Sequence, residues 1–196
     1  MNLRWTQQLA STLLLTLLLS GCAGLLVGGT AVGVSVAHDR RTTGTVIDDQ
    51  TIELKLYDAL NKKLPPGNQI SVTSYNGIVL LTGETVSGAA RWQAEDVVRH
   101  LDEPPVRMVH NELIIAPPSP LSVQSNDVLL TTKVKTALFQ INHIPGFDPT
   151  RVKVVTHRAV VYLMGLVYST EANAASDVAS QVSEVRQVVT LFEIID

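Results

Sequence analysis

The sequence predicts an α+β protein built from two small units in tandem, each with the order helix, strand, strand, helix, strand. Residues 70–83 and 152–165, which lie 82 positions apart, share an alternating strand, a polar tip, an aliphatic strand and a closing glycine. Segments with helical spacing of apolar residues flank both, and a third apolar strand, at 106–115 and at 185–195, ends each unit. We therefore expect, twice, two helices packed on one face of a small mixed three-stranded sheet.

The four helices are predicted from apolar residues that recur every three or four positions. In the first unit these are Ile52, Leu56, Ala59 and Leu60 before the hairpin, and Ala90, Ala94, Val97, Val98 and Leu101 after it. In the second unit they are Leu130, Val134, Ala137, Leu138 and Ile141, then Ala175, Val178, Ala179 and Val182. Because carboxylates favour helix N-termini, we expect Asp48-Asp49 and Asp127 at the starts of two helices.

The two hairpin tips differ in sequence. Asn76-Gly77 is a strong short-turn signal, because both residue types tolerate positive φ. Arg158-Ala159 lacks that chemistry, so we expect a different turn type in the second unit.

The N-terminus predicts an exported lipoprotein. Arg4 precedes an apolar stretch, residues 9–19, that is too short to span a bilayer comfortably. Leu19-Ser20-Gly21-Cys22 has the leucine, small residues and cysteine of a lipobox. We expect cleavage before Cys22, which then carries diacylglycerol and palmitate; the alternative is an ordinary signal peptide with an incidental cysteine. As the chain has one cysteine, no intramolecular disulfide is expected.

The domain organisation follows from these signals. We expect a signal peptide (1–21), a lipidated tether (22–46), a first unit (47–116), a proline-rich linker (117–124) and a second unit (125–196). Within the tether, the apolar, glycine-rich residues 23–37 either lie at the membrane surface or form a flexible connection.

Composition and motifs exclude several functions. A net charge of −3 lacks the basic footprint of a nucleic-acid-binding protein. None of the five histidines has metal-ligand spacing, and no hydrolase, phosphate-loop or dinucleotide motif occurs. We therefore expect no enzyme activity, no metal and no cofactor.

The ends of the second strands, IVLLTG and VVYLMG, resemble those of the BON domain. Two such units after a lipobox, with DRRTTGT before the first and SNDVLLTTKVK opening the second, resemble the dual BON-domain outer-membrane lipoproteins of the DolP (YraP) family. The resemblance implies an outer-membrane anchor facing the periplasm, which Ala23 after the cysteine also favours. It further implies binding of anionic phospholipid such as phosphatidylglycerol or cardiolipin, support of outer-membrane integrity and enrichment at division sites.

The family resemblance implies that the first helix of the second unit, about residues 126–140, contacts lipid. Helical geometry points the same way, because one set of residues faces away from the core stripe: Val128, Leu129, Thr132, Lys135 and Thr136, with Lys133 at the edge. Aliphatic insertion with lysines for headgroups suits a membrane interface. In the alternative, Val128 and Leu129 pack against the linker or the first unit.

Two further alternatives stay open from the sequence. The chain could be a protein-interaction adaptor for envelope assembly or for cell-wall remodelling enzymes, using sheet edges or the helix at 126–140. In the loop that follows this helix, Phe147 either adds an exposed aromatic ring or packs on the core.

Overall fold

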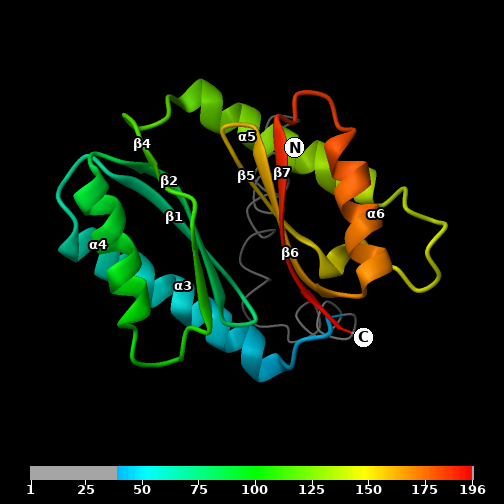
Figure 1. The fold of residues 1–196 in the computed structure, drawn as a ribbon, viewed down its shortest axis with the longest axis horizontal. Coiled ribbons are helices and arrows are strands. Elements are labelled where there is room, and N and C mark those ends of the chain that lie inside the picture. Colours follow the sequence, from blue (N-terminus) through cyan, green and yellow to red (C-terminus); the bar gives the residue numbers. More distant parts are fainter. Residues whose placement is uncertain (1–38, 196) are drawn as a thin grey trace, which may run out of the picture. The chain divides into compact units, whose positions relative to one another are not determined.

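Each hairpin belongs to its own sheet, where its second strand is the central one, and helices lie on one side of each sheet (Figure 1). The computed structural model describes residues 39–195, which belong to one compact unit spanning His38–Asp196. The predicted signal peptide, Cys22 and the tether up to residue 38 lie outside the described residues.

The first repeat contains α3 (Thr43–Lys63), β1 (Gln69–Tyr75), β2 (Ile78–Thr85), α4 (Gly88–Arg99), β3 (Met108–Asn111) and β4 (Ile114–Ile115). Strand β2 is central, antiparallel to β1 and parallel to β3, and the short β4 also pairs with β2. The second repeat contains α5 (Leu121–Leu138), the 3-10 turn η2 (Pro149–Arg151), β5 (Lys153–His157), β6 (Val160–Val167), α6 (Ser169–Ser180) and β7 (Gln187–Ile194). Its strand order β5-β6-β7 repeats the first pattern. The α+β class and the mixed sheets are confirmed.

Two helices extend further than predicted, and one strand is divided. Helix α3 begins at Thr43, inside the expected tether, because the Thr42 hydroxyl accepts a hydrogen bond from Thr45 N–H and caps it. Helix α5 begins at Leu121, inside the expected linker, directly after Pro120 with its helix-compatible φ of −63°. The strand expected at 106–115 is interrupted between β3 and β4, where the Asn111 side chain accepts a hydrogen bond from Leu113 N–H.

The closing glycines are needed because the backbone of another segment passes against them. A Cβ on Gly83 would lie 2.0 Å from the Gln69 carbonyl oxygen, and one on Gly165 would lie 2.6 Å from the Arg151 carbonyl oxygen. No side chain fits at either position, which explains the glycine two residues before the end of the central strand in both repeats.

Alternate residues of the central strands enter different cores. In β2, Val79 and Leu81 pack with the apolar stripes of α3 and α4, whereas Leu80 faces the other way. In β6, Val161 and Leu163 likewise face α5 and α6. The remaining large side chains meet in a third cluster formed by Tyr75, Leu80, Tyr162 and Met164. The two sheets therefore bury both faces, with helices on one side and the partner sheet on the other.

The second hairpin turn has the same backbone form as the first, so the prediction of a different turn type is wrong. Asn76 and Gly77 have φ of 54° and 73°, and Arg158 and Ala159 have φ of 48° and 62°. The carboxylate of Asp127 accepts hydrogen bonds from the N–H groups of Arg158 and Ala159, at 2.8 and 2.9 Å. These two bonds stabilise a conformation that the residues themselves do not favour.

We expect Ala159→Gly to raise the free energy of unfolding by about 0.5–1 kcal/mol. Glycine avoids the cost of a Cβ at positive φ, about 1–2 kcal/mol. Glycine also increases the conformational entropy of the unfolded chain, which offsets part of this stabilisation. Guanidinium denaturation measures the difference. Gly77→Ala is the matched reverse substitution, and its Cβ would lie 3.2 Å from the Arg107 side chain, so it should destabilise. Destabilisation by Ala159→Gly would contradict the expectation.

Candidate functional site

Helix α5 is held on its sheet by an apolar face and by one buried carboxylate. Leu130, Val134 and Leu138 are fully buried in the core of the second repeat. Asp127, also buried, ties the helix to the β5–β6 turn through both of its carboxylate oxygens. The rotation of the helix about its axis is therefore fixed, and so is the face that it presents to solvent.

The outward face of α5 is the one that the sequence predicts. Val128 and Leu129 are 66% and 60% exposed, so neither is buried against the linker or the first repeat. The remaining predicted members are also exposed: Thr132, Lys133, Lys135 and Thr136. The structure thus brings all six predicted residues onto one surface.

This surface continues in both directions beyond the predicted residues. Leu121 at the start of α5 and Phe139 at its C-cap are 76% and 67% exposed. Helical spacing places both on the line through Val128, Thr132 and Lys135. We name the α5 outer stripe as Leu121, Val128, Leu129, Thr132, Lys135, Thr136 and Phe139. The sequence interpretation missed Leu121 because the helix was expected to begin at about residue 126. Phe139 lies inside the expected helix, and following the outward positions one turn past Lys135 would have found it.

The loop aromatic does not belong to this surface. Phe147 is partly buried and packs on the core of the second repeat, so the expectation that it packs on the core is confirmed. Phe139, not Phe147, is the exposed ring of this region.

Most polar side chains on the outward face of α5 already have hydrogen-bond or ion-pair partners within the protein. The hydroxyls of Thr132 and Thr136 donate to the carbonyl oxygens of Val128 and Thr132, one turn earlier in the helix. Lys133 pairs with Glu184 at 3.1 Å, and both side chains are exposed, so this bond is weak. Within the described part of the chain, Lys135 has no carboxylate partner. Its ammonium therefore remains available to an external anion.

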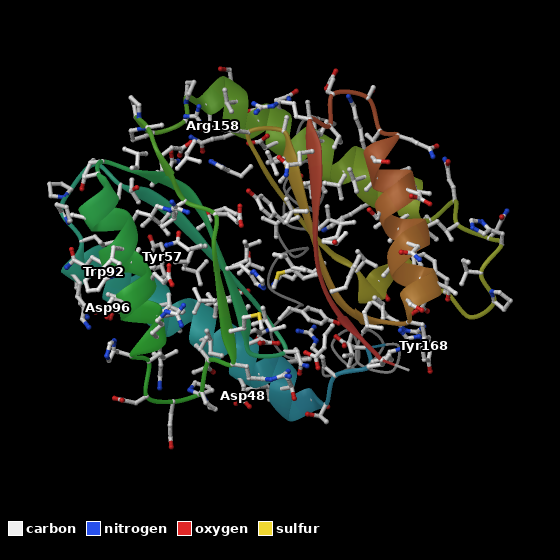
Figure 2. All side chains as sticks on the ribbon, in the orientation of Figure 1. Asp48, Tyr57, Trp92, Asp96, Arg158 and Tyr168 are labelled. Carbon is white, nitrogen blue, oxygen red and sulfur yellow. The ribbon has the colours of Figure 1, made fainter. Side chains whose placement is uncertain are left out.

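Behind α5, a buried carboxylate joins the two repeats. Glu84 of β2 accepts hydrogen bonds from the Ser119 hydroxyl and from Arg158 Nε, the latter at 2.6 Å, and both use its Oε1. Arg158 lies at the tip of the β5–β6 hairpin (Figure 2) and also donates to the Pro117 carbonyl. Burial alone would raise the pKa of Glu84, but the hydrogen bonds from Ser119 and Arg158 and the nearby His157 outweigh it. The pKa of this carboxyl therefore lies below its usual value.

The segment before α3 connects the repeats at the opposite end. Arg40 forms two hydrogen bonds with the buried Glu171 of α6, at 2.5 and 2.9 Å, and stacks 4.5 Å from the ring centre of Tyr168. Arg41 pairs instead with Asp49 of α3 at 2.7 Å and lies over Tyr75. Within the DRRTTGT segment, Arg40 therefore binds the second repeat and Arg41 binds the first.

The acidic residues expected at helix starts have other positions. Asp49 lies inside α3, where it is buried and accepts hydrogen bonds from the N–H groups of Asn76 and Gly77 at 2.7 and 2.9 Å. Asp127 has the equivalent place and task in α5. Both carboxylates therefore cap a hairpin turn and not a helix, because the turn N–H groups point at them across the sheet.

Among the described residues, no group of histidine, cysteine and carboxylate side chains is arranged to hold a metal ion. No helix within residues 39–195 has the length and apolarity needed to cross a membrane.

A family model for the BON domain matches residues 48–117 and 126–196. A full-length relative is the outer membrane lipoprotein DolP of Haemophilus influenzae, which is 36% identical over 198 residues and covers 100% of both chains. The chain therefore belongs to the BON-domain family, and within it to the dual BON-domain lipoproteins of the DolP family. It is an outer-membrane lipoprotein.

Two other similarities are more distant. A 21 kDa hemolysin of Actinobacillus pleuropneumoniae is 30% identical over 153 residues, which cover 77% of this chain and 76% of the hemolysin. The C-terminal domain of CdsD, from the type III secretion system of Chlamydia trachomatis, shares 13% identity over 72% of this chain and 96% of that one. The TM-score of that structural match is 0.25, too low to support an inference.

Proposed function

We propose that this lipoprotein, anchored by lipid on Cys22, binds anionic phospholipid through the α5 outer stripe and thereby supports outer-membrane integrity, including at division sites. The observation that carries the proposal is the exposure of Val128 and Leu129 on a helix whose rotation is fixed. Beside them lies Lys135, which has no carboxylate partner within residues 39–195. Exposed apolar side chains that adjoin one another mark an interaction surface more often than single ones do. Phosphatidylglycerol and cardiolipin are the expected lipids.

The energies suit a shallow, reversible contact. Burying an aliphatic side chain fully contributes about 1.5–3 kcal/mol, and a lysine near an anionic surface contributes about 1 kcal/mol. The stripe therefore supplies a few kcal/mol, which is less than an acyl anchor supplies. In this proposal the anchor holds the protein at the membrane, and α5 selects the lipid beneath it. No catalytic step is involved.

We expect Leu129→Glu to weaken binding to anionic vesicles by about 30-fold or more, since it removes an inserted side chain and adds a repelled charge. The measurement is co-sedimentation of residues 38–196 at low salt with phosphatidylglycerol or cardiolipin vesicles and with neutral ones. Leu54→Glu is the matched control, because Leu54 is an exposed leucine on α3 of the first repeat. Lys135→Glu should weaken binding while Lys63→Glu should not. Equal losses for Leu129→Glu and Leu54→Glu would contradict a role for α5.

A second candidate is the protein-interaction adaptor, and one observation favours it. The helices of the first repeat expose Leu54 from α3. They also expose Tyr57 from α3 and Trp92 from α4, which are labelled in Figure 2. The two functions are separated by expressing each variant in a cell that lacks the native gene and measuring its resistance to detergent. If the Leu54→Glu variant fails to restore detergent resistance while the Leu129→Glu variant restores it, the adaptor function is the better account.

A further inference from the structure

A polar pocket of about 200 Å³ lies between the first sheet and α5. Its walls include Gln69, Ser71, Glu84, Ser119, Val128 and His157. Since a water molecule takes up about 30 Å³ in the liquid, this volume admits a group of several non-hydrogen atoms. Val128 belongs both to the pocket wall and to the α5 outer stripe, so the pocket opens beside that stripe.

Three buried side-chain atoms in the described part of the chain have no hydrogen-bond partner, and all three belong to this pocket. They are Gln69 Oε1, Glu84 Oε2 and His157 Nε2. Glu84 is fully buried, and its protein hydrogen bonds all go to Oε1, which leaves Oε2 to the pocket. Each unsatisfied buried group costs about 1–3 kcal/mol, so three in one place indicate a site that a polar ligand completes.

The three atoms define the hydrogen-bonding character of the ligand. Glu84 Oε2 and Gln69 Oε1 are acceptors. His157 Nε2 lies 3.1 Å from Glu84 Oε1 but is not hydrogen-bonded to it. A nitrogen this close to a carboxylate oxygen carries a hydrogen, so it is a donor that the protein leaves unused. A ligand for this pocket needs two donors and at least one acceptor.

A vicinal diol meets that requirement, and charged groups do not. Its two hydroxyls donate to Glu84 and Gln69, and an oxygen lone pair accepts from His157. A phosphate would lie against the Glu84 carboxylate, and an ammonium would lie close to the Arg158 guanidinium, which is 2.6 Å from Glu84.

We infer that this pocket binds the vicinal diol of a small polyol beside the α5 outer stripe. The inference rests on the proposed function for its location at a membrane surface. Two sources share this chemistry: the glycerol of a lipid headgroup, and a free polyol in the surrounding solution. The experiment below separates them.

The first arm compares vesicles of phosphatidylglycerol and of phosphatidic acid at equal surface charge, since only the former carries a headgroup diol. The expected preference of residues 38–196 for phosphatidylglycerol is about 3- to 10-fold, the value of one or two hydrogen bonds. Gln69→Leu should abolish the preference and keep the binding common to both lipids. Gln50→Leu, the same substitution at an exposed position on α3, should keep the preference. Equal binding of both lipids by the unsubstituted protein, or an unchanged preference in Gln69→Leu, overturns a lipid source.

The second arm titrates free glycerol and follows the amide resonances of Gln69, Gly83 and His157. Saturable shifts that Gln69→Leu abolishes support the diol pocket with a free polyol as a source, even if no vesicle binds and the proposed function fails. A lipid preference without such shifts supports the headgroup as the source. The inference is overturned if there is neither a preference nor a saturable shift.

Discussion

Asp49→Ala should lower the free energy of unfolding by about 3–5 kcal/mol, the range found when a buried charged group is removed from its partners. The carboxylate accepts hydrogen bonds from the Ser74 hydroxyl at 2.7 Å and from the N–H groups of Asn76 and Gly77. It also pairs with Arg41. Alanine leaves all four donors without this acceptor, and most of them are shielded from water.

Denaturation by guanidinium of residues 38–196 measures this loss. Asp49→Asn keeps one of the two oxygens and should lose about half as much. Asp58→Ala is the matched control on the same helix, because Asp58 is exposed and its one ion pair within the described residues is with Lys62, one turn away. Its effect should stay within about 0.5 kcal/mol. A loss below about 1 kcal/mol for Asp49→Ala would show that the hairpin turn does not depend on the buried carboxylate.

Glu84→Leu is expected to have an effect of similar size, about 3 kcal/mol, at the junction between the repeats. It removes the acceptor of the Ser119 hydroxyl and leaves the Arg158 guanidinium half-buried without its carboxylate. The apolar cluster of Tyr75, Leu80, Tyr162 and Met164 should still hold the sheets together, so we expect a destabilised protein that keeps its secondary structure.

The Glu84 contribution also depends on pH, and its sign follows from the lowered pKa. A carboxyl whose folded pKa lies below its ordinary value of 4.5 stabilises the fold fully above that value. The stabilisation is lost as the pH falls through the folded pKa. Glu171, held by Arg40, has the same direction of shift. Denaturation midpoints should therefore fall steeply below about pH 4.5, and less steeply in Glu84→Gln. A protein equally stable at about pH 6 and about pH 3.5 would contradict this account.

The repeated fold is predictable from sequence because the determining signals are local. Apolar residues at every second position specify strands, and apolar residues at every third or fourth position specify helices. The glycines at 83 and 165 lie near the ends of both central strands. The outward face of α5 follows from the same periodicity: once Leu130 and Val134 face the core, Val128 and Leu129 must face outward.

The contacts between repeats are not predictable in this way, because each involves residues far apart in the sequence. The contacts of Glu84 with Arg158 and of Arg40 with Glu171 exist only in the assembled fold. One signal was present: the consecutive aliphatic residues of β2 and β6 require cover on both faces, and the helices cover only one. The form of the second turn and the role of Asp127 were missed together. The Asp127 carboxylate, about 30 residues before the turn, stabilises a conformation that the turn residues do not favour.

The contact between α5 and lipid is tested most directly by a fluorescent probe at its centre. The chain has a single cysteine, Cys22, so residues 38–196 contain none and Leu129→Cys gives one labelling site. A polarity-sensitive dye at position 129 should shift to the blue with phosphatidylglycerol vesicles and be quenched by brominated acyl chains. The same dye at Leu54→Cys should report water throughout. If the protein binds these vesicles while the probe at 129 stays in water, α5 is not the lipid-contacting helix.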